Sequence, residues 1–211
     1  MSASTITFAK SLEPEDRIRA DFYAIFARLF FSPPDADLLR VIGSAPLLDA
    51  EADAADLAIS WAKLSAAARV MDPDAAQDEY EALFGGVGHS AVSLFGSFYV
   101  GGSTTGAGAP FLVDLRTALM ELGLGLQQGQ NVPEDHVAPV FETMRLLIEG
   151  GPGVEPRSIA EQKAFFTAFV APWCAKCCTA IAQNSVANFY KVVAQSTNAF
   201  VAIEDESFAI S

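Results

Sequence analysis

The chain is poor in basic residues. Its 211 residues include 13 Lys and Arg against 26 Asp and Glu, which gives a formal net charge of −13. A nucleic-acid-binding protein needs clustered positive charge to neutralise phosphates, so this deficit argues against that class. Hydrophobic residues make up 51% of the chain, whereas disordered chains combine high net charge with low hydrophobicity. We therefore expect a folded, acidic protein whose partners are basic and partly apolar.

Long apolar runs and cysteines are also scarce. The longest apolar stretch, residues 164–175, is interrupted by Thr167 and Pro172, and a membrane span needs roughly 20 apolar residues. Residues 1–16 lack the basic leader and apolar stretch of a secretory signal. The odd number of cysteines, 3, argues against a secreted disulfide framework. These absences predict a cytoplasmic protein without a membrane span.

Apolar residues recur with helical spacing through most of the chain. After Pro14, the residues Phe22, Phe26 and Phe30 form part of one apolar stripe, and Ser32-Pro33-Pro34 ends it. Similar patterns predict helices over 35–43, 49–71, 72–84, 110–122, 137–148, 158–181 and 186–203. No segment alternates apolar and polar residues as a strand would. The sequence thus predicts an all-α fold, a single-domain helical bundle spanning residues 1–211.

Two details of this helical pattern carry further expectations. Pro139 falls after the start of its helix, where a proline should cause a kink. Residues 204–211 follow the last periodic segment, so we expect them to form a frayed, flexible tail.

A glycine-rich connection separates two groups of predicted helices. Eight glycines fall between Gly85 and Gly108, around an aromatic insert at residues 94–99. Connections this long are usually functional or disordered, and the aromatic insert favours a functional loop over about 85–109. A nucleotide-binding loop would place Lys and then Ser or Thr after its last glycine, but Ala107 follows Gly106.

The remaining polar clusters allow more than one interpretation. Cys174, Cys177 and Cys178 lie in a predicted helix; buried thiols are the favoured interpretation, and a metal- or redox-active site is the alternative. His136 with Asp135 and Glu134 could form an acid–base cluster, yet no nucleophile motif lies nearby. The favoured interpretation is that the two acids stabilise a helix N-terminus. The sequence therefore favours a binding protein over an enzyme and predicts no cofactor.

Five fragments occur in an order that resembles a known family. They are Tyr80-x-x-Leu83-Phe84, Gly96-Ser97-Phe98-Tyr99, Pro133-Glu134-Asp135-His136, Pro172-Trp173 and Phe189-Tyr190. This order is similar to that of the TorD/DmsD/NarJ family of cytoplasmic chaperones for molybdenum-cofactor redox enzymes. The resemblance covers roughly residues 15–205.

The resemblance implies an all-α fold of the TorD type and a role in assembly rather than catalysis. Its members bind the twin-arginine signal peptide of an apo catalytic subunit, a reductase or dehydrogenase, and hold that subunit back from export until its cofactor is inserted. Residues at matching positions would bind the peptide: Asp135 and His136 at the groove, Tyr80, Leu83 and Phe84 along its apolar part, and Ser97 and Tyr99 on the loop side.

Three positions depart from the family pattern. Gly96 stands where the family often has Glu, Val140 replaces the first of two acids in the following helix, and Pro139 is unexpected. Glu142 keeps the second acid. The identity of the client, the choice between monomer and homodimer, and the binding of a nucleotide or cofactor precursor stay open at this point. A plain interaction module or a small helical enzyme would be favoured if Ser97, Asp135 and His136 lay far apart.

Overall fold

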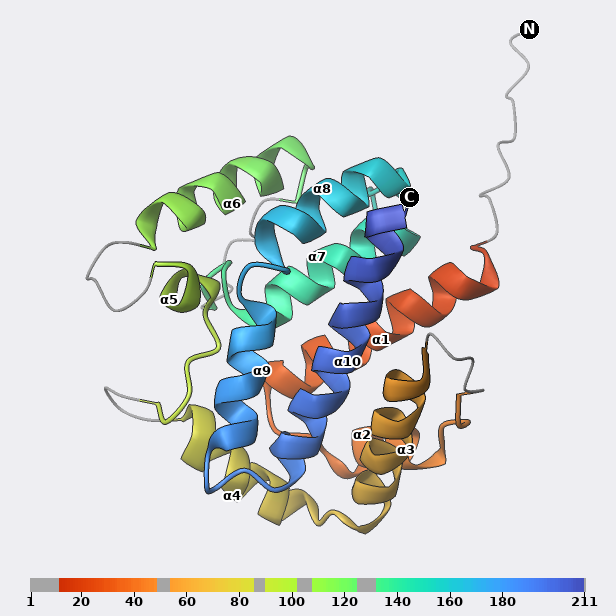
Figure 1. Cartoon of the computed structure of the whole chain (residues 1–211), viewed down its shortest axis with the longest axis vertical. Helices are drawn as coiled ribbons and strands as arrows, with labels where there is room; N and C mark the ends of the chain where they lie inside the picture. The colour runs from red at the N-terminus through yellow and green to blue at the C-terminus, as the bar shows by residue number, and fades with distance from the viewer. Residues whose placement is uncertain (1–11, 49–53, 86–89, 102–107, 125–131, 211) are drawn as a thin grey trace, which may run out of the picture.

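The predicted helices pack into one bundle in a computed structural model (Figure 1). The structure describes residues 12–48, 54–85, 90–101, 108–124 and 132–210. Its helices are α1 (Pro14–Phe31), α2 (Ala36–Ser44), α3 (Ala55–Val70), α4 (Pro73–Phe84), α5 (Gly96–Val100), α6 (Ala109–Glu121), α7 (Val137–Glu149), α8 (Ile159–Phe169), α9 (Cys174–Gln183) and α10 (Phe189–Ile210). In these ranges the only β-type pairings are two isolated bridges. The prediction of an all-α, single-domain bundle is confirmed.

The core of the bundle is built on the apolar stripe of α1. This helix packs along α7 and is crossed by α10. The ring of Tyr23 on α1 meets Phe141 of α7 edge-on at 5.5 Å and Phe200 of α10 at 4.8 Å. Aromatic rings in these edge-on arrangements stabilise a core beyond the area they bury. Helix α1 is therefore joined through its buried face to α7 and α10, two helices that lie far from it in the sequence.

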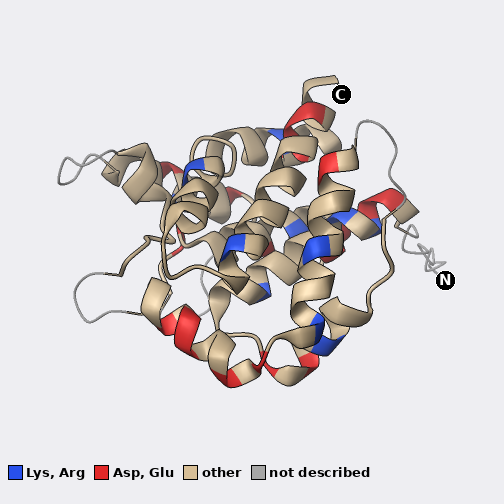
Figure 2. Ribbon diagram, turned by 60° about the horizontal axis from the view of Figure 1, so that its bottom comes forward, with Lys and Arg blue, Asp and Glu red and all other residues tan. Residues whose placement is uncertain are grey.

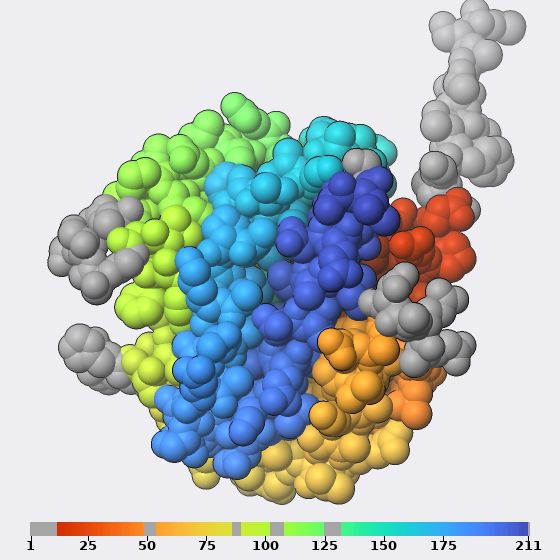
Figure 3. All heavy atoms as spheres, in the orientation of Figure 1, coloured from red at the N-terminus to blue at the C-terminus, as the bar shows by residue number. Residues whose placement is uncertain are grey.

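Helix α10 runs beside α9 along one face of the molecule, with α3 on its other side (Figure 3). Its first turn is capped from a distant helix. The buried carboxylate of Glu79 on α4 accepts hydrogen bonds from the backbone N–H groups of Asn188 at 2.8 Å, Phe189 at 3.1 Å and Tyr190 at 2.8 Å. A carboxylate is well placed there, because the N–H groups of a first turn have no partner within the helix.

The expected frayed tail at 204–211 is wrong for residues 204–210, because α10 continues to Ile210. Glu204 is buried and accepts hydrogen bonds from Arg19 and Tyr23 of α1. One turn later, the ring of Phe208 packs at 5.1 Å from that of Phe166 on α8. These contacts hold the last turns of the helix against the bundle.

The expected kink at Pro139 is also wrong. His136 is the N-cap of α7, so Pro139 stands at the third helical position, where the missing N–H would have had no helical acceptor. By contrast, Pro172 divides the helix predicted over 158–181 into α8 and α9, which are bent by 50°.

The remaining boundaries differ in detail from the predictions. The glycine-rich connection contains a short helix, α5, and the predicted start of the helix over 49–71 lies outside the described residues up to position 53. Among the described helices, no single one is long and apolar enough to cross a membrane; the bent pair α8 and α9 meets the criteria of length and composition together.

Candidate functional site

Asp135 joins the glycine-rich connection to the start of α7. Its carboxylate accepts a hydrogen bond from the Ser97 N–H at 3.1 Å, and its carbonyl accepts one from the Gly96 N–H at 2.8 Å. In the next residues, the Val137 N–H donates to the Leu94 carbonyl at 2.9 Å. The structure thus brings Ser97 and Asp135 together, as the sequence predicted. However, Asp135 is only 3% exposed, so its carboxylate is occupied within the protein.

His136 lies next to this junction and caps α7. Its Nδ1 accepts a hydrogen bond from the Ala138 N–H at 3.1 Å, and its ring meets Phe95 edge-on at 5.2 Å. Burial lowers the pKa of His136 to about 4, against the opposing effect of Asp135. The imidazole is therefore neutral at neutral pH and carries its proton on Nε2, because Nδ1 acts as an acceptor.

A prediction tests the junction formed by Asp135. Asp135→Ala should lower the free energy of unfolding by about 1–3 kcal/mol, since the partly buried N–H of Ser97 loses its acceptor. Amide exchange at Ser97 should accelerate in the same variant. Asp135→Asn keeps an acceptor and should cost much less; equal losses in urea denaturation of both variants would contradict this role.

Gly96 and Tyr99 fix the short helix α5 against the bundle. A Cβ atom at Gly96 would lie 2.8 Å from Phe111 Cε1 and 2.9 Å from Trp173 Cε2, so the close approach requires glycine. The Tyr99 ring stacks on Trp173 at 6.2 Å, and its hydroxyl donates to the Ser93 carbonyl at 2.7 Å. The family departure at Gly96 is thus explained by packing.

Tyr80, Leu83 and Phe84 belong to a second cluster, where α4 meets α1 and α10. Leu83 is fully buried, and the Tyr80 hydroxyl donates to backbone carbonyls at the end of α1. The rings of Tyr80 and Phe84 meet that of Tyr190 on α10 at 5.7 Å and 5.1 Å. The family resemblance places these three residues with Asp135 along one groove, whereas in the structure they contact α1 and α10.

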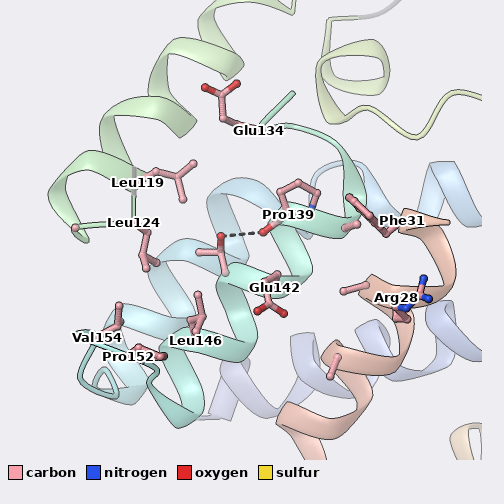
Figure 4. A pocket seen from close by; sticks show the side chains of 15 residues that line it. Arg28, Phe31, Leu119, Leu124, Glu134, Pro139, Glu142, Leu146, Pro152 and Val154 are labelled. Carbon is pink, nitrogen blue, oxygen red and sulfur yellow. Dashed lines mark hydrogen bonds between the residues drawn. The ribbon is translucent and has the colours of Figure 1, made fainter. Parts of the chain in front are cut away.

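A cavity of about 650 Å³ lies between α1, α6, α7 and the turn that follows α7 (Figure 4). It is lined by Ala24, Ala27, Arg28, Phe31, Leu119, Gly123, Leu124, Glu134, Ala138, Pro139, Glu142, Thr143, Leu146, Pro152 and Val154. Most of this lining is apolar, and Phe31 is 55% exposed beside it. None of the seven site residues predicted from the sequence lines the cavity. The signals that could have found it are the small residues Ala24 and Ala27 on one face of α1.

Two acidic residues, Glu134 and Glu142, contribute to the lining of this cavity, and each is held by an arginine. Arg116 donates through Nε to Glu134 Oε1 at 3.0 Å and through Nη2 to Oε2 at 3.2 Å. Arg145 binds Glu142 in the same forked manner, at 2.8 Å and 2.5 Å, and also pairs with Glu149. The hydrogen bonds from Arg116 lower the pKa of Glu134, so this carboxyl is charged at neutral pH.

The cavity also contains one cation. Arg28 on α1 pairs with Asp35 at 3.3 Å and contacts the Ser32 hydroxyl. Both partners lie just beyond the end of α1, so the charge of Arg28 is compensated locally. Apolar walls and carboxylates therefore dominate the chemistry of the cavity.

The three cysteines lie in the core. The Cys177 thiol donates to the Ser93 carbonyl at 3.5 Å. The hydrogen bond with Cys174 and burial raise the pKa of Cys178, and burial raises that of Cys177, which keeps both thiols protonated. Among the residues that the structure describes, no group of three or more His, Cys, Asp or Glu is placed to hold a metal ion. The contacts agree with the favoured interpretation of buried thiols.

A helical bundle with an apolar, carboxylate-flanked cavity and a buried, neutral histidine has the features of a binding protein. A family model described as nitrate reductase delta subunit matches residues 50–179, and the chain belongs to this family, which consists of chaperones for molybdoenzyme maturation. The resemblance predicted from the sequence is thus confirmed. A search of curated proteins gave no match. The matched range runs from the region of α3 into α9, so it includes α6 and α7 of the cavity but not α1.

Proposed function

We propose that this chaperone acts in the cytoplasm and binds the twin-arginine leader of the apo catalytic subunit of a molybdenum oxidoreductase. Binding would hold the subunit back from export until its cofactor is inserted. The observation that carries the proposal is the cavity between α1, α6 and α7, where an apolar lining surrounds Glu134 and Glu142. Family membership supports a molybdoenzyme as the client.

The chemistry of the cavity fits both parts of such a leader. Its basic part contains two guanidinium groups, and carboxylates bind guanidinium in a forked, charge-assisted geometry. Its apolar part needs a groove of aliphatic and aromatic side chains, which Phe31, Leu119 and Leu146 provide. Asp and Glu residues occur on several helices (Figure 2), and the net negative charge would speed the encounter with a basic peptide.

Four of the site residues predicted from the sequence would stabilise one wall of the cavity without lining it. Asp135 and His136 fix the start of α7, which forms one wall, and Ser97 and Tyr99 belong to the segment that they hold. Direct contacts of these four residues with the leader, and of Tyr80, Leu83 and Phe84, stay predictions.

Calorimetric titration with a synthetic peptide tests the proposal. The peptide contains two consecutive arginines followed by a stretch rich in Leu and Phe. We expect micromolar or tighter binding that weakens with added salt. Replacing both arginines by glutamines should weaken binding by about 10- to 100-fold, because two charge-assisted hydrogen-bonded pairs are lost.

Glu142→Gln should weaken binding of the arginine peptide in the same direction. Asp37→Asn is the matched control, since it removes one negative charge from the exposed surface of α2, outside the cavity. Absence of binding to leaders from candidate molybdoenzymes would refute the proposal. Equal affinity for the arginine and glutamine peptides would refute the role of the carboxylates.

A further inference from the structure

We propose that the carboxylate of Glu134 binds an arginine of the leader, and that in the free protein Arg116 is bound to this carboxylate instead. Binding would then exchange one guanidinium for another on Glu134. This inference rests on the proposed function and assigns the arginine subsite to one residue of the cavity.

The two partners of this ion pair differ sharply in exposure. The side chain of Glu134 is 10% exposed and lines the cavity, whereas that of Arg116 is 52% exposed. Arg116 lies on α6, three residues before Leu119, which also lines the cavity. The largely buried carboxylate of Glu134 is thus paired with the long, exposed side chain of Arg116.

The geometry of the pair matches the geometry that a leader arginine would need. Arg116 uses Nε and Nη2 to contact both carboxylate oxygens, at 3.0 Å and 3.2 Å. A guanidinium from the cavity side would form the same forked pair. A lysine ammonium could not, because it lacks two parallel donors in one plane. The exchange would therefore favour arginine over lysine in the leader.

The other carboxylate that lines the cavity, Glu142, has a more firmly held partner. That partner, Arg145, is 24% exposed and is shared between Glu142 and Glu149, so two carboxylates retain it. By contrast, Arg116 donates charge-assisted hydrogen bonds to the carboxylate of Glu134. Glu134 is accordingly the carboxylate whose internal partner is exchanged at the lowest cost.

The exchange also avoids leaving a charge unpaired. An exposed guanidinium regains its hydration when it leaves an ion pair, so such pairs are weak. A largely buried carboxylate that loses its partner is penalised much more. Because the leader arginine replaces Arg116, Glu134 stays paired throughout. Arg116 thus acts as a competitor that lowers the affinity for weak or non-specific basic peptides.

The test compares Arg116→Gln with Arg40→Gln, using the arginine and glutamine peptides described above. Arg40 lies on α2 in an exposed ion pair with Asp37, so both variants make the same change in net charge. Removal of the competitor should tighten binding of the arginine peptide by about two- to fivefold, the value of an exposed ion pair. Arg40→Gln should give a smaller gain, and neither variant should tighten binding of the glutamine peptide.

A second measurement uses the unmodified protein. The side-chain Nε–H signal of Arg116 in a ¹⁵N NMR spectrum, assigned with the Arg116→Gln variant or with Arg116→Lys, should move toward the position of a solvated arginine as the peptide saturates the protein. The Nε–H signal of Arg145 should stay in place.

The outcomes separate this inference from the proposed function. If the unmodified protein binds the arginine peptide but the Arg116 signal does not move, the exchange is refuted and the proposed function stands. The same holds if Arg116→Gln gains no more affinity than Arg40→Gln. If the unmodified protein binds no leader peptide, both are refuted.

Discussion

Glu204→Ala is expected to lower the free energy of unfolding by about 3–5 kcal/mol, the usual cost of removing one partner of a buried ion pair. The Glu204 carboxylate is 2% exposed. It accepts hydrogen bonds from Arg19 Nε at 2.7 Å and Nη2 at 3.0 Å, and from the Tyr23 hydroxyl at 3.0 Å. Burial and Glu204 raise the pKa of Tyr23, so its hydroxyl remains a donor at neutral pH. The variant leaves this hydroxyl without its acceptor, and it leaves the largely buried guanidinium of Arg19 with Asp16 as its remaining partner, at 2.9 Å.

Urea denaturation of Glu204→Ala and Asp205→Ala provides the measurement. Asp205 is exposed on the same turn of α10, so its replacement makes the same change in charge and a similar change in helix propensity. The control should stay within about 0.5 kcal/mol of the parent protein. If the two variants lose equal stability, the ion pair does not anchor the end of α10.

The titration of His136 alone should lower the free energy of unfolding by up to about 3 kcal/mol between pH 6.5 and pH 4. Burial lowers the pKa of this residue in the folded state to about 4, from about 6.5 in the unfolded chain. Above pH 6.5 both states are neutral at this position, and the shift has no effect. As the pH falls below 6.5, the unfolded chain binds a proton that the folded protein does not, which favours unfolding.

His136→Asn isolates this contribution. Asparagine keeps an acceptor at the N-cap of α7, so the helix retains its cap, but it does not titrate. The difference in free energy of unfolding between the parent protein and the variant, measured at several pH values, should therefore change over this window. A difference that is constant from pH 7 to pH 4 would show that His136 is accessible to protons in the folded state.

Local patterns in the sequence were sufficient for most of the helices. The apolar stripe of α1, between Pro14 and Ser32-Pro33-Pro34, predicted both its bounds and its buried face. Such signals lie in residue types and short spacings, which a sequence displays directly. The grouping of Ser97 with Asp135 came from the family resemblance instead, and a hydrogen bond joins these two residues across 38 positions.

Features that depend on distant partners were not predictable in this way. Glu204 looked like part of an exposed acidic tail, because its partner Arg19 is 185 residues away. The cavity escaped prediction for the same reason, since α1 and α7 contribute to it from opposite parts of the sequence. Asp135 was expected to face the leader, but the carboxylates that line the cavity are Glu134 and Glu142. Which of the two adjacent acids lines the cavity depends on the turn geometry before α7 rather than on residue type.

The two distant carboxylates that hold α10 have a mechanical consequence. Glu79 anchors its first turn to α4, and Glu204 anchors it near the other end to α1, which in turn packs along α7. Helix α6, on the opposite side of the cavity, packs chiefly against the short α5 and α8, and Gly123 with φ +74° ends it. The wall of the cavity formed by α1 and α7 is therefore tied to the rest of the bundle, whereas the wall formed by α6 has weaker packing. If leaders bind here as proposed, we expect leaders that differ in bulk to displace α6 more than the wall formed by α1 and α7.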